Sequence, residues 1–173
     1  MNTGRRFLWT IAVIYLCVAT FVSAQDSRTI DFPSSAAALD QVAFIHGGTG
    51  PFAVAGYRIG ERALKALNVS RGTFSLEVIH KTPNEVQWSC VADGVQAATG
   101  VSIGKLNLKL ESVSRDAVET IVRDRASGRT IVFRLKPQFV KRYLDLSHEK
   151  LEAAGREVLS LSDEQIFSVE GPS

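Results

Sequence analysis

The spacing of apolar residues predicts two helices in the first half of the chain. The first helix begins at Ser34 or Ser35, whose hydroxyl can cap it, and it ends at Gly47-Gly48. Its inward face, at helical spacing, comprises Leu39, Val42, Ala43 and His46. Pro51 suits the first position of the second helix. The buried stripe of that helix comprises Phe52, Ala55, Gly56, Ile59, Ala63 and Leu67. His46 is therefore expected at a helix end, on the side that faces the core.

From Thr73 onwards, apolar and polar residues alternate, which predicts a strand. One face of this strand comprises Phe74, Leu76, Val78 and His80. A third helix is expected to run from Cys90 to about Thr99, with Ser89 as its N-cap. Gly100 then ends it, as glycine commonly does at the end of a helix.

Three more strands and a helical C-terminal region complete the pattern. The strands are expected at 106–110, 117–123 and 130–135. A short turn at 126–128 joins the last two as an antiparallel hairpin. Pro137 opens the helical region, which breaks or restarts at Ser147. The order of elements predicts an α+β fold, a single domain with a mainly antiparallel sheet packed by helices.

Residues 1–24 have the composition of a secretory signal peptide. Two arginines precede an apolar stretch from Phe7 to Val22, and small residues close it at Ser23-Ala24. The stretch is short for a membrane span and no basic flank follows it, which disfavours a membrane anchor. We therefore expect cleavage after Ala24, export to the periplasm or the exterior, and one domain at 25–173.

Removal of the leader changes the charge and the cysteine content. The leader holds two of the 20 basic residues and none of the 18 acidic residues, so the exported domain is formally neutral. A neutral domain has no basic surplus for sequence-independent binding, which argues against nucleic acid as a partner. Cys17 leaves with the leader, and Cys90 remains as a single thiol that cannot form an intramolecular disulfide.

Helix ends are expected to bring candidate chemistry together around Cys90. His46 closes the first helix, and Ser89-Cys90 is expected to open the third. The positive end of a helix dipole stabilises anions, including thiolates. Cys90 is therefore expected where a reactive or metal-binding thiolate is favoured. Lys105, in the turn after the third helix, adds a cation.

Several stretches of the chain form a series that covers most of the exported domain. They are 46–51, 55–58, 90–96, 104–108 and 161–167. In order and at fitting intervals, this series resembles FmdE, a domain family named after formylmethanofuran dehydrogenase. That family typically reads His-Gly-His-x-Cys-Pro-Gly in its first motif, with the His and Cys residues implicated in binding a metal such as zinc. Here His46 matches the first His, whereas Gly48 and Gly50 replace the second His and the Cys.

The resemblance implies metal ligands and a ligand pocket. His46 and Cys90 are the ligands that remain, and because catalytic zinc normally takes three protein ligands, His80 or Asp93 would supply the third. The implied ligand pocket comprises His46, Cys90, Asp93, Gln96, Lys105 and Asn107. The altered first motif implies that the formylmethanofuran dehydrogenase activity is not inherited.

Three classes of function follow from the sequence. The leading hypothesis is an exported binding protein for a small anionic ligand or a divalent metal, with a degenerate metal site. The second is a thiol-dependent enzyme or redox accessory that uses Cys90. The third is a structural or partner-binding domain that has lost its site.

Overall fold

The computed structural model describes residues 34–171. Its helices are α1 Ser35–His46, α2 Pro51–Leu67, α3 Val86–Thr99, α4 Pro137–Tyr143, α5 His148–Ser160 and α6 Asp163–Ile166, with short 3-10 helices η1 Ile103–Lys105 and η2 Arg115–Ala117. Its strands are β1 Leu76–Thr82, β2 Leu108–Ser112, β3 Glu119–Asp124, β4 Thr130–Leu135 and β5 Phe167–Glu170. The predicted signal peptide lies outside the described residues. Between residues 34 and 171, no helix is long and apolar enough to cross a membrane.

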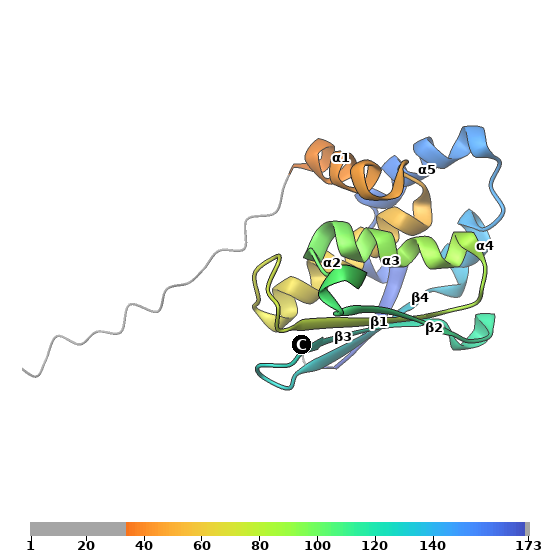
Figure 1. Cartoon of the computed structure of the whole chain (residues 1–173). Helices are drawn as coiled ribbons and strands as arrows, with labels where there is room; N and C mark the ends of the chain where they lie inside the picture. The colour runs from red at the N-terminus through yellow and green to blue at the C-terminus, as the bar shows by residue number, and fades with distance from the viewer. Residues whose placement is uncertain (1–33, 172–173) are drawn as a thin grey trace, which may run out of the picture.

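The five strands form one sheet with helices on one of its sides. The strand order is β2-β1-β3-β4-β5, in which β1 and β2 are parallel and the other neighbours are antiparallel. Helices α2 and α3 lie next to the sheet, and α1 and α5 lie further out, as Figure 1 shows. The prediction of a single α+β domain with a mainly antiparallel sheet is confirmed.

The core lies between the sheet and the layer formed by α2 and α3. Buried and half-buried side chains alternate along β1, as expected for a strand with one covered face. The buried ones are Leu76, Val78, His80 and Thr82. Valines and isoleucines of the two helices are buried in the same core, including Val54, Ile59, Val91 and Val95. His80 is therefore a polar side chain within a largely apolar layer.

Glycines fix the helices at very short distances from neighbouring backbone. A Cβ on Gly94 of α3 would lie 1.8 Å from the carbonyl oxygen of Ala53 in α2. A Cβ on Gly155 of α5 would lie 1.7 Å from the carbonyl oxygen of Thr49. Only a residue without a Cβ permits such an approach. These contacts hold α3 and the loop after His46 in fixed positions.

The third helix begins earlier than the sequence predicted. α3 starts at Val86 with Glu85 as its N-cap, so the predicted start at Cys90 with Ser89 as the cap is wrong. The Glu85 side chain makes no capping hydrogen bond and instead accepts one from Arg115 Nη2 at 2.6 Å. The usual Ser, Thr, Asp or Asn cap signal is therefore missing at the true start. Cys90 lies one turn inside the helix rather than at its first position.

Two further expectations need correction. Phe74, which the alternation placed in the core, is 69% exposed, and β1 begins only at Leu76. β5 was not predicted, because four residues after a short helix give no clear alternation. Its Phe167 is buried and its ring meets that of Phe133 edge to face, at 5.4 Å between centroids.

Candidate functional site

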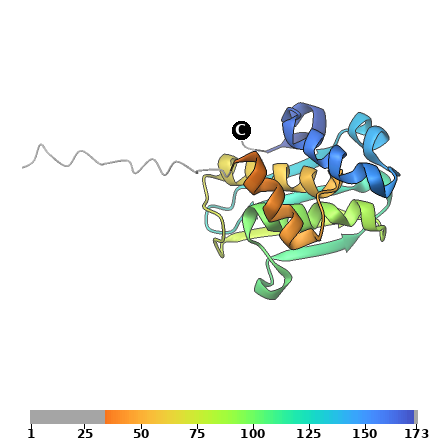
Figure 2. The ribbon, with the colours of Figure 1, turned by 90° about the horizontal axis from the view of Figure 1, so that it is seen from above.

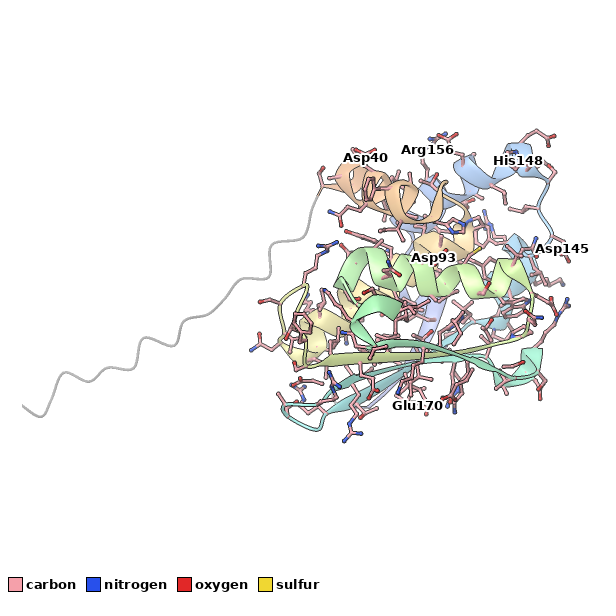
Figure 3. All side chains as sticks on the ribbon, in the orientation of Figure 1. Asp40, Asp93, Asp145, His148, Arg156 and Glu170 are labelled. Carbon is pink, nitrogen blue, oxygen red and sulfur yellow. The ribbon has the colours of Figure 1, made fainter. Side chains whose placement is uncertain are left out.

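His46 and Asp93 form an ion pair between the end of α1 and the middle of α3. His46 Nδ1 lies 2.8 Å from Asp93 Oδ2. The side chains are 22% and 45% exposed respectively, so the pair is open to solvent on one side. Asp93 is labelled in Figure 3, where it projects from α3 on the side towards α1. The sequence singled out both residues but offered no reason to join them.

The local sequence places His46 where a positive charge is favoured. Gly47 adopts a φ of 84° and ends α1, and its N–H donates to the carbonyl oxygen of Ala43. His46 is thus the last helical residue, beside the negative end of the helix dipole. The protonated imidazole is stabilised by this position before any side-chain partner is considered.

Cys90 completes the cluster from the same helix as Asp93. The two residues are three positions apart on α3 and therefore share a face. The pKa of His46 is raised to about 10, chiefly by the hydrogen bond with Asp93 and next by that with Cys90, against the opposing effect of partial burial. The thiol is half-buried and its Sγ donates to the carbonyl oxygen of Val86 at 2.9 Å. We call His46, Cys90 and Asp93 the thiol cluster.

The comparisons with known proteins agree on one family. The family model described as FmdE, molybdenum formylmethanofuran dehydrogenase operon, matches residues 45–168. The chain belongs to the FmdE family. The match begins one residue before His46 and spans the thiol cluster, α2 and the sheet.

A solved structure has the same fold as this FmdE-family chain. It is the crystal structure of an FmdE-like protein of the tungsten formylmethanofuran dehydrogenase type from Syntrophus aciditrophicus. The two share 18% sequence identity with a TM-score of 0.55, over 83% of this chain and 74% of the other. No curated protein matches the chain. The likeness to the solved structure establishes the fold.

His80, a possible third ligand, has other partners in this FmdE domain. It is 1% exposed, with Nδ1 lying 2.9 Å from Thr120 Oγ1 and Nε2 lying 3.1 Å from the carbonyl oxygen of Trp88. A carbonyl only accepts, so Nε2 carries the proton and Nδ1 accepts from the threonine hydroxyl. Burial lowers the pKa of His80, against the raising effect of its hydrogen bonds with backbone. The ring is neutral and links β1, β3 and α3.

The remaining residues of the predicted pocket have structural contacts. Asn107 is fully buried, donates from Nδ2 to the carbonyl oxygen of Leu76 at 2.9 Å and accepts from the N–H of Ser102 at 3.0 Å. Lys105 Nζ donates to the carbonyl oxygen of Gly100 at 2.8 Å and lies 5.2 Å from the centre of the exposed Phe74 ring. Gln96 is half-buried on α3. The structure assigns Asn107 and Lys105 to the turn between α3 and β2.

The donor set does not fit the zinc that the FmdE resemblance implies. His46 Nδ1 is held by Asp93, the Cys90 thiol points to a backbone carbonyl, and both nitrogens of His80 are occupied. In the part of the chain that the structure describes, no three His, Cys, Asp or Glu side chains form a group that could hold a metal ion. Zinc needs at least three such protein ligands. The chemistry of the cluster is therefore derived from its own side chains.

Arg58 belongs to a second polar region that sequence reasoning did not assign a role. Its guanidinium donates to the carbonyl oxygens of Leu159 and Leu161 at 2.8 and 2.7 Å and to Asp163 Oδ1 at 2.7 Å. These bonds anchor the end of α5 to α2. Beside them lies an open cavity of about 730 Å³, lined by Ser35, Ala38, Arg58, Glu61, Arg62, Lys65, Leu159, Ser160, Leu161 and Asp163. The signal in the sequence was the repeated basic residues on one face of α2.

Proposed function

We propose that the protein is an exported thiol-dependent enzyme or redox accessory in which Cys90 reacts as a thiolate. The observation that carries this proposal is the contact of one imidazole, His46, with both Asp93 and the thiol. An imidazolium next to a sulfur atom stabilises its ionised form. A third group that orients the imidazole completes the arrangement typical of activated cysteine nucleophiles.

Each residue of the thiol cluster has a role in this chemistry. Asp93 accepts from Nδ1 and keeps the His46 ring oriented and protonated. When Cys90 ionises, its sulfur leaves the Val86 carbonyl and turns to the imidazolium. The sulfur then attacks an electrophilic carbon or sulfur of a small substrate, and the bond to the leaving group breaks. The His46 imidazolium gives its proton to that leaving group.

Binding of a small anion, our leading hypothesis from the sequence, is the second candidate. The observation in its favour is the positive charge that His46 keeps at neutral pH. The Asp93 carboxylate already compensates that charge at 2.8 Å. The cluster therefore has no surplus positive charge to attract an anion once Cys90 is ionised, and thiol chemistry is the better-supported function.

Export is part of the proposal. In an oxidising compartment, a reactive thiol can exchange with disulfides of partner molecules. Intact-mass measurement of the protein recovered outside the cytoplasm should give a chain that begins at Gln25. Recovery of the uncleaved chain, with Met1 retained, would contradict this part of the proposal.

The pH dependence of Cys90 alkylation tests the proposed chemistry. The rate of reaction with iodoacetamide should already be near its plateau below neutral pH, whereas an ordinary thiol reacts mainly above about pH 8. His46→Ala should lower the rate at about pH 6.5 on the order of tenfold, because the gain in ionisation outweighs the lower nucleophilicity of a stabilised thiolate. His148→Ala, at an exposed position on α5, is the matched control and should change nothing.

Two results would overturn the thiol proposal. The first is a wild-type rate that rises only above about pH 8 and does not respond to His46→Ala. The second is stoichiometric metal in protein purified without chelator, lost in Cys90→Ala, because a metal-bound sulfur would be a ligand rather than a nucleophile. Thermal unfolding with a panel of small anions tests the second candidate: stabilisation that His46→Ala removes would favour anion binding.

A further inference from the structure

Strand β2 is an open edge of the sheet. It is the first strand in the order β2-β1-β3-β4-β5 and pairs only with β1 among the described strands. Figure 2 shows it along the margin of the molecule, with η1 projecting beside it. Four of its five side chains are exposed, and Leu110 is 53% exposed. Natural proteins usually cover or disrupt such an edge, because it is a template for pairing with another strand.

The pairing with β1 determines which backbone groups of β2 are free. The Val78 N–H donates to the carbonyl oxygen of Asn107 at 2.8 Å, and the Val113 N–H donates to that of Thr82 at 3.1 Å. The odd-numbered residues of this segment therefore direct their backbone groups towards β1. Leu108, Leu110 and Ser112 direct their N–H and C=O groups away from the sheet, towards whatever lies next to the edge.

We propose that β2 is a self-association surface, on which β2 of a second copy pairs antiparallel about a two-fold axis at Leu110. In this register Leu110 lies opposite Leu110 of the second copy, and Leu108 lies opposite Ser112. All three residues have outward backbone groups, so each of these pairs exchanges hydrogen bonds. The result is one continuous sheet through both copies. This inference does not depend on the proposed thiol chemistry.

Charge selects this register over its neighbours. Hydrogen bonding requires pairs of even-numbered residues, so the register can shift only in steps that keep this parity. Centring on Leu110 places Lys109 opposite Glu111 of the second copy, twice by symmetry. Centring one residue earlier places Lys109 opposite Lys109, and centring one residue later places Glu111 opposite Glu111. Opposite charges stabilise a cross-strand pair and like charges destabilise it.

Apolar side chains around the edge favour the same partner. Leu110 lies on the helix-covered face of the sheet, where its register partner on β1 is the buried His80. Ile103 and Leu106 are exposed on or directly after η1, at the start of β2. In the antiparallel arrangement they lie near the end of the second copy's β2. Pairing therefore removes apolar surface from water as well as satisfying backbone groups.

Sedimentation velocity from micromolar to millimolar concentration tests the proposal, with reductant present so that Cys90 cannot cross-link two chains. The wild type should form a dimer. Leu110→Pro removes an outward N–H that β1 does not use, so the monomer should stay folded while the dimer is lost. Cys90→Ala should dimerise as the wild type does, which separates this test from that of the thiol chemistry.

Charge reversal gives a second, more specific test. Lys109→Glu places Glu opposite Glu, and Glu111→Lys places Lys opposite Lys, so each variant alone should lose about tenfold or more in dimer affinity. Mixed together, the two variants place opposite charges at both positions and should form the heterodimer. Thermal melting checks each folded monomer, because Lys109 also pairs with Glu77 Oε1 at 3.1 Å within the chain.

The outcomes separate cleanly. A wild-type dimer that Leu110→Pro abolishes, together with heterodimer formation by the two charge variants, supports the pairing. A monomeric wild type across the concentration range overturns it. So does a dimer that survives Leu110→Pro or one in which the mixed charge variants associate no better than each alone, because these results place the interface elsewhere.

Discussion

The protein contains two histidines whose surroundings give them opposite charge states. His46 ends a helix, is partly exposed, and contacts a carboxylate and a thiol, so its pKa is raised to about 10. His80 lies inside the core, between a threonine hydroxyl and a backbone carbonyl, and burial lowers its pKa. At neutral pH the first is an imidazolium and the second is a neutral ring.

The difference teaches which histidine is available for chemistry. His80 has both nitrogens engaged by fixed groups of β3 and α3, and a charge there has no carboxylate among its hydrogen-bond partners. His46 has one nitrogen held by Asp93 and faces a sulfur that a solute can approach. Burial makes His80 a structural residue, while an ion pair near the surface makes His46 a proton donor.

Loss of the His80 side chain should have the largest effect on stability. His80→Ala leaves a cavity in the core and removes both hydrogen bonds, so we expect a loss of about 3 kcal/mol in the free energy of unfolding. His46→Ala should cost at most about 1 kcal/mol, because its ion pair is partly exposed. Urea unfolding of the two variants checks this contrast. Equal losses would show that burial does not separate the two histidines.

The two histidines should also restrict stability from opposite sides of neutrality. The folded state binds the His46 proton more tightly than the unfolded state, so stability falls as pH rises from about 6.5 towards about 10. The folded state disfavours the His80 proton, so stability falls as pH drops below about 6.5. The alkaline slope should stay under the about 1.4 kcal/mol per pH unit of one full proton, since Asp93 is half-exposed.

Urea midpoints measured across this pH range test that shape. His46→Gln should flatten the alkaline side while leaving the acid side as it is in the wild type. His148→Gln is the matched control and should leave both sides unchanged. An alkaline slope that persists in His46→Gln would assign it to another group.

The sequence predicted the elements better than it predicted the partners of polar residues. Helical stripes located α1 and α2, and the hairpin turn located β3 and β4, because these signals are local. The start of α3 was missed because Glu85 lacks a capping hydrogen bond. Phe74 was misplaced because alternation does not say where a strand begins.

The candidate site depends on contacts between distant parts of the chain. His46 and Asp93 are 47 positions apart, and they meet because α1 packs against α3. Asn107, assigned to the pocket by resemblance, instead binds the carbonyl of Leu76, 31 positions away. A sequence states which residues can act as acids, bases or ligands. The packing of helices determines which of them meet.

Asp93→Asn should alter the thiol chemistry less than His46→Ala does. The amide keeps a hydrogen bond to the ring but removes the negative charge, so the pKa of His46 falls and its positive charge beside Cys90 weakens. We expect a decrease of a few-fold in iodoacetamide alkylation near neutral pH, with the free energy of unfolding changed by under about 1 kcal/mol. No change in the alkylation profile would show that Asp93 does not position the imidazole.

Lys105→Ala should have the smallest effect of these variants. Its ammonium binds the carbonyl oxygen of Gly100 just after α3, so its loss should cost about 0.5–1 kcal/mol of stability. Alkylation of Cys90 should stay within about twofold of the wild type, because the partners of Lys105 are Gly100 and Phe74 rather than the thiol cluster. A drop in alkylation as large as that of Asp93→Asn would instead place Lys105 in the site, as the resemblance implied. It would also show that the turn after α3 moves towards Cys90 in solution.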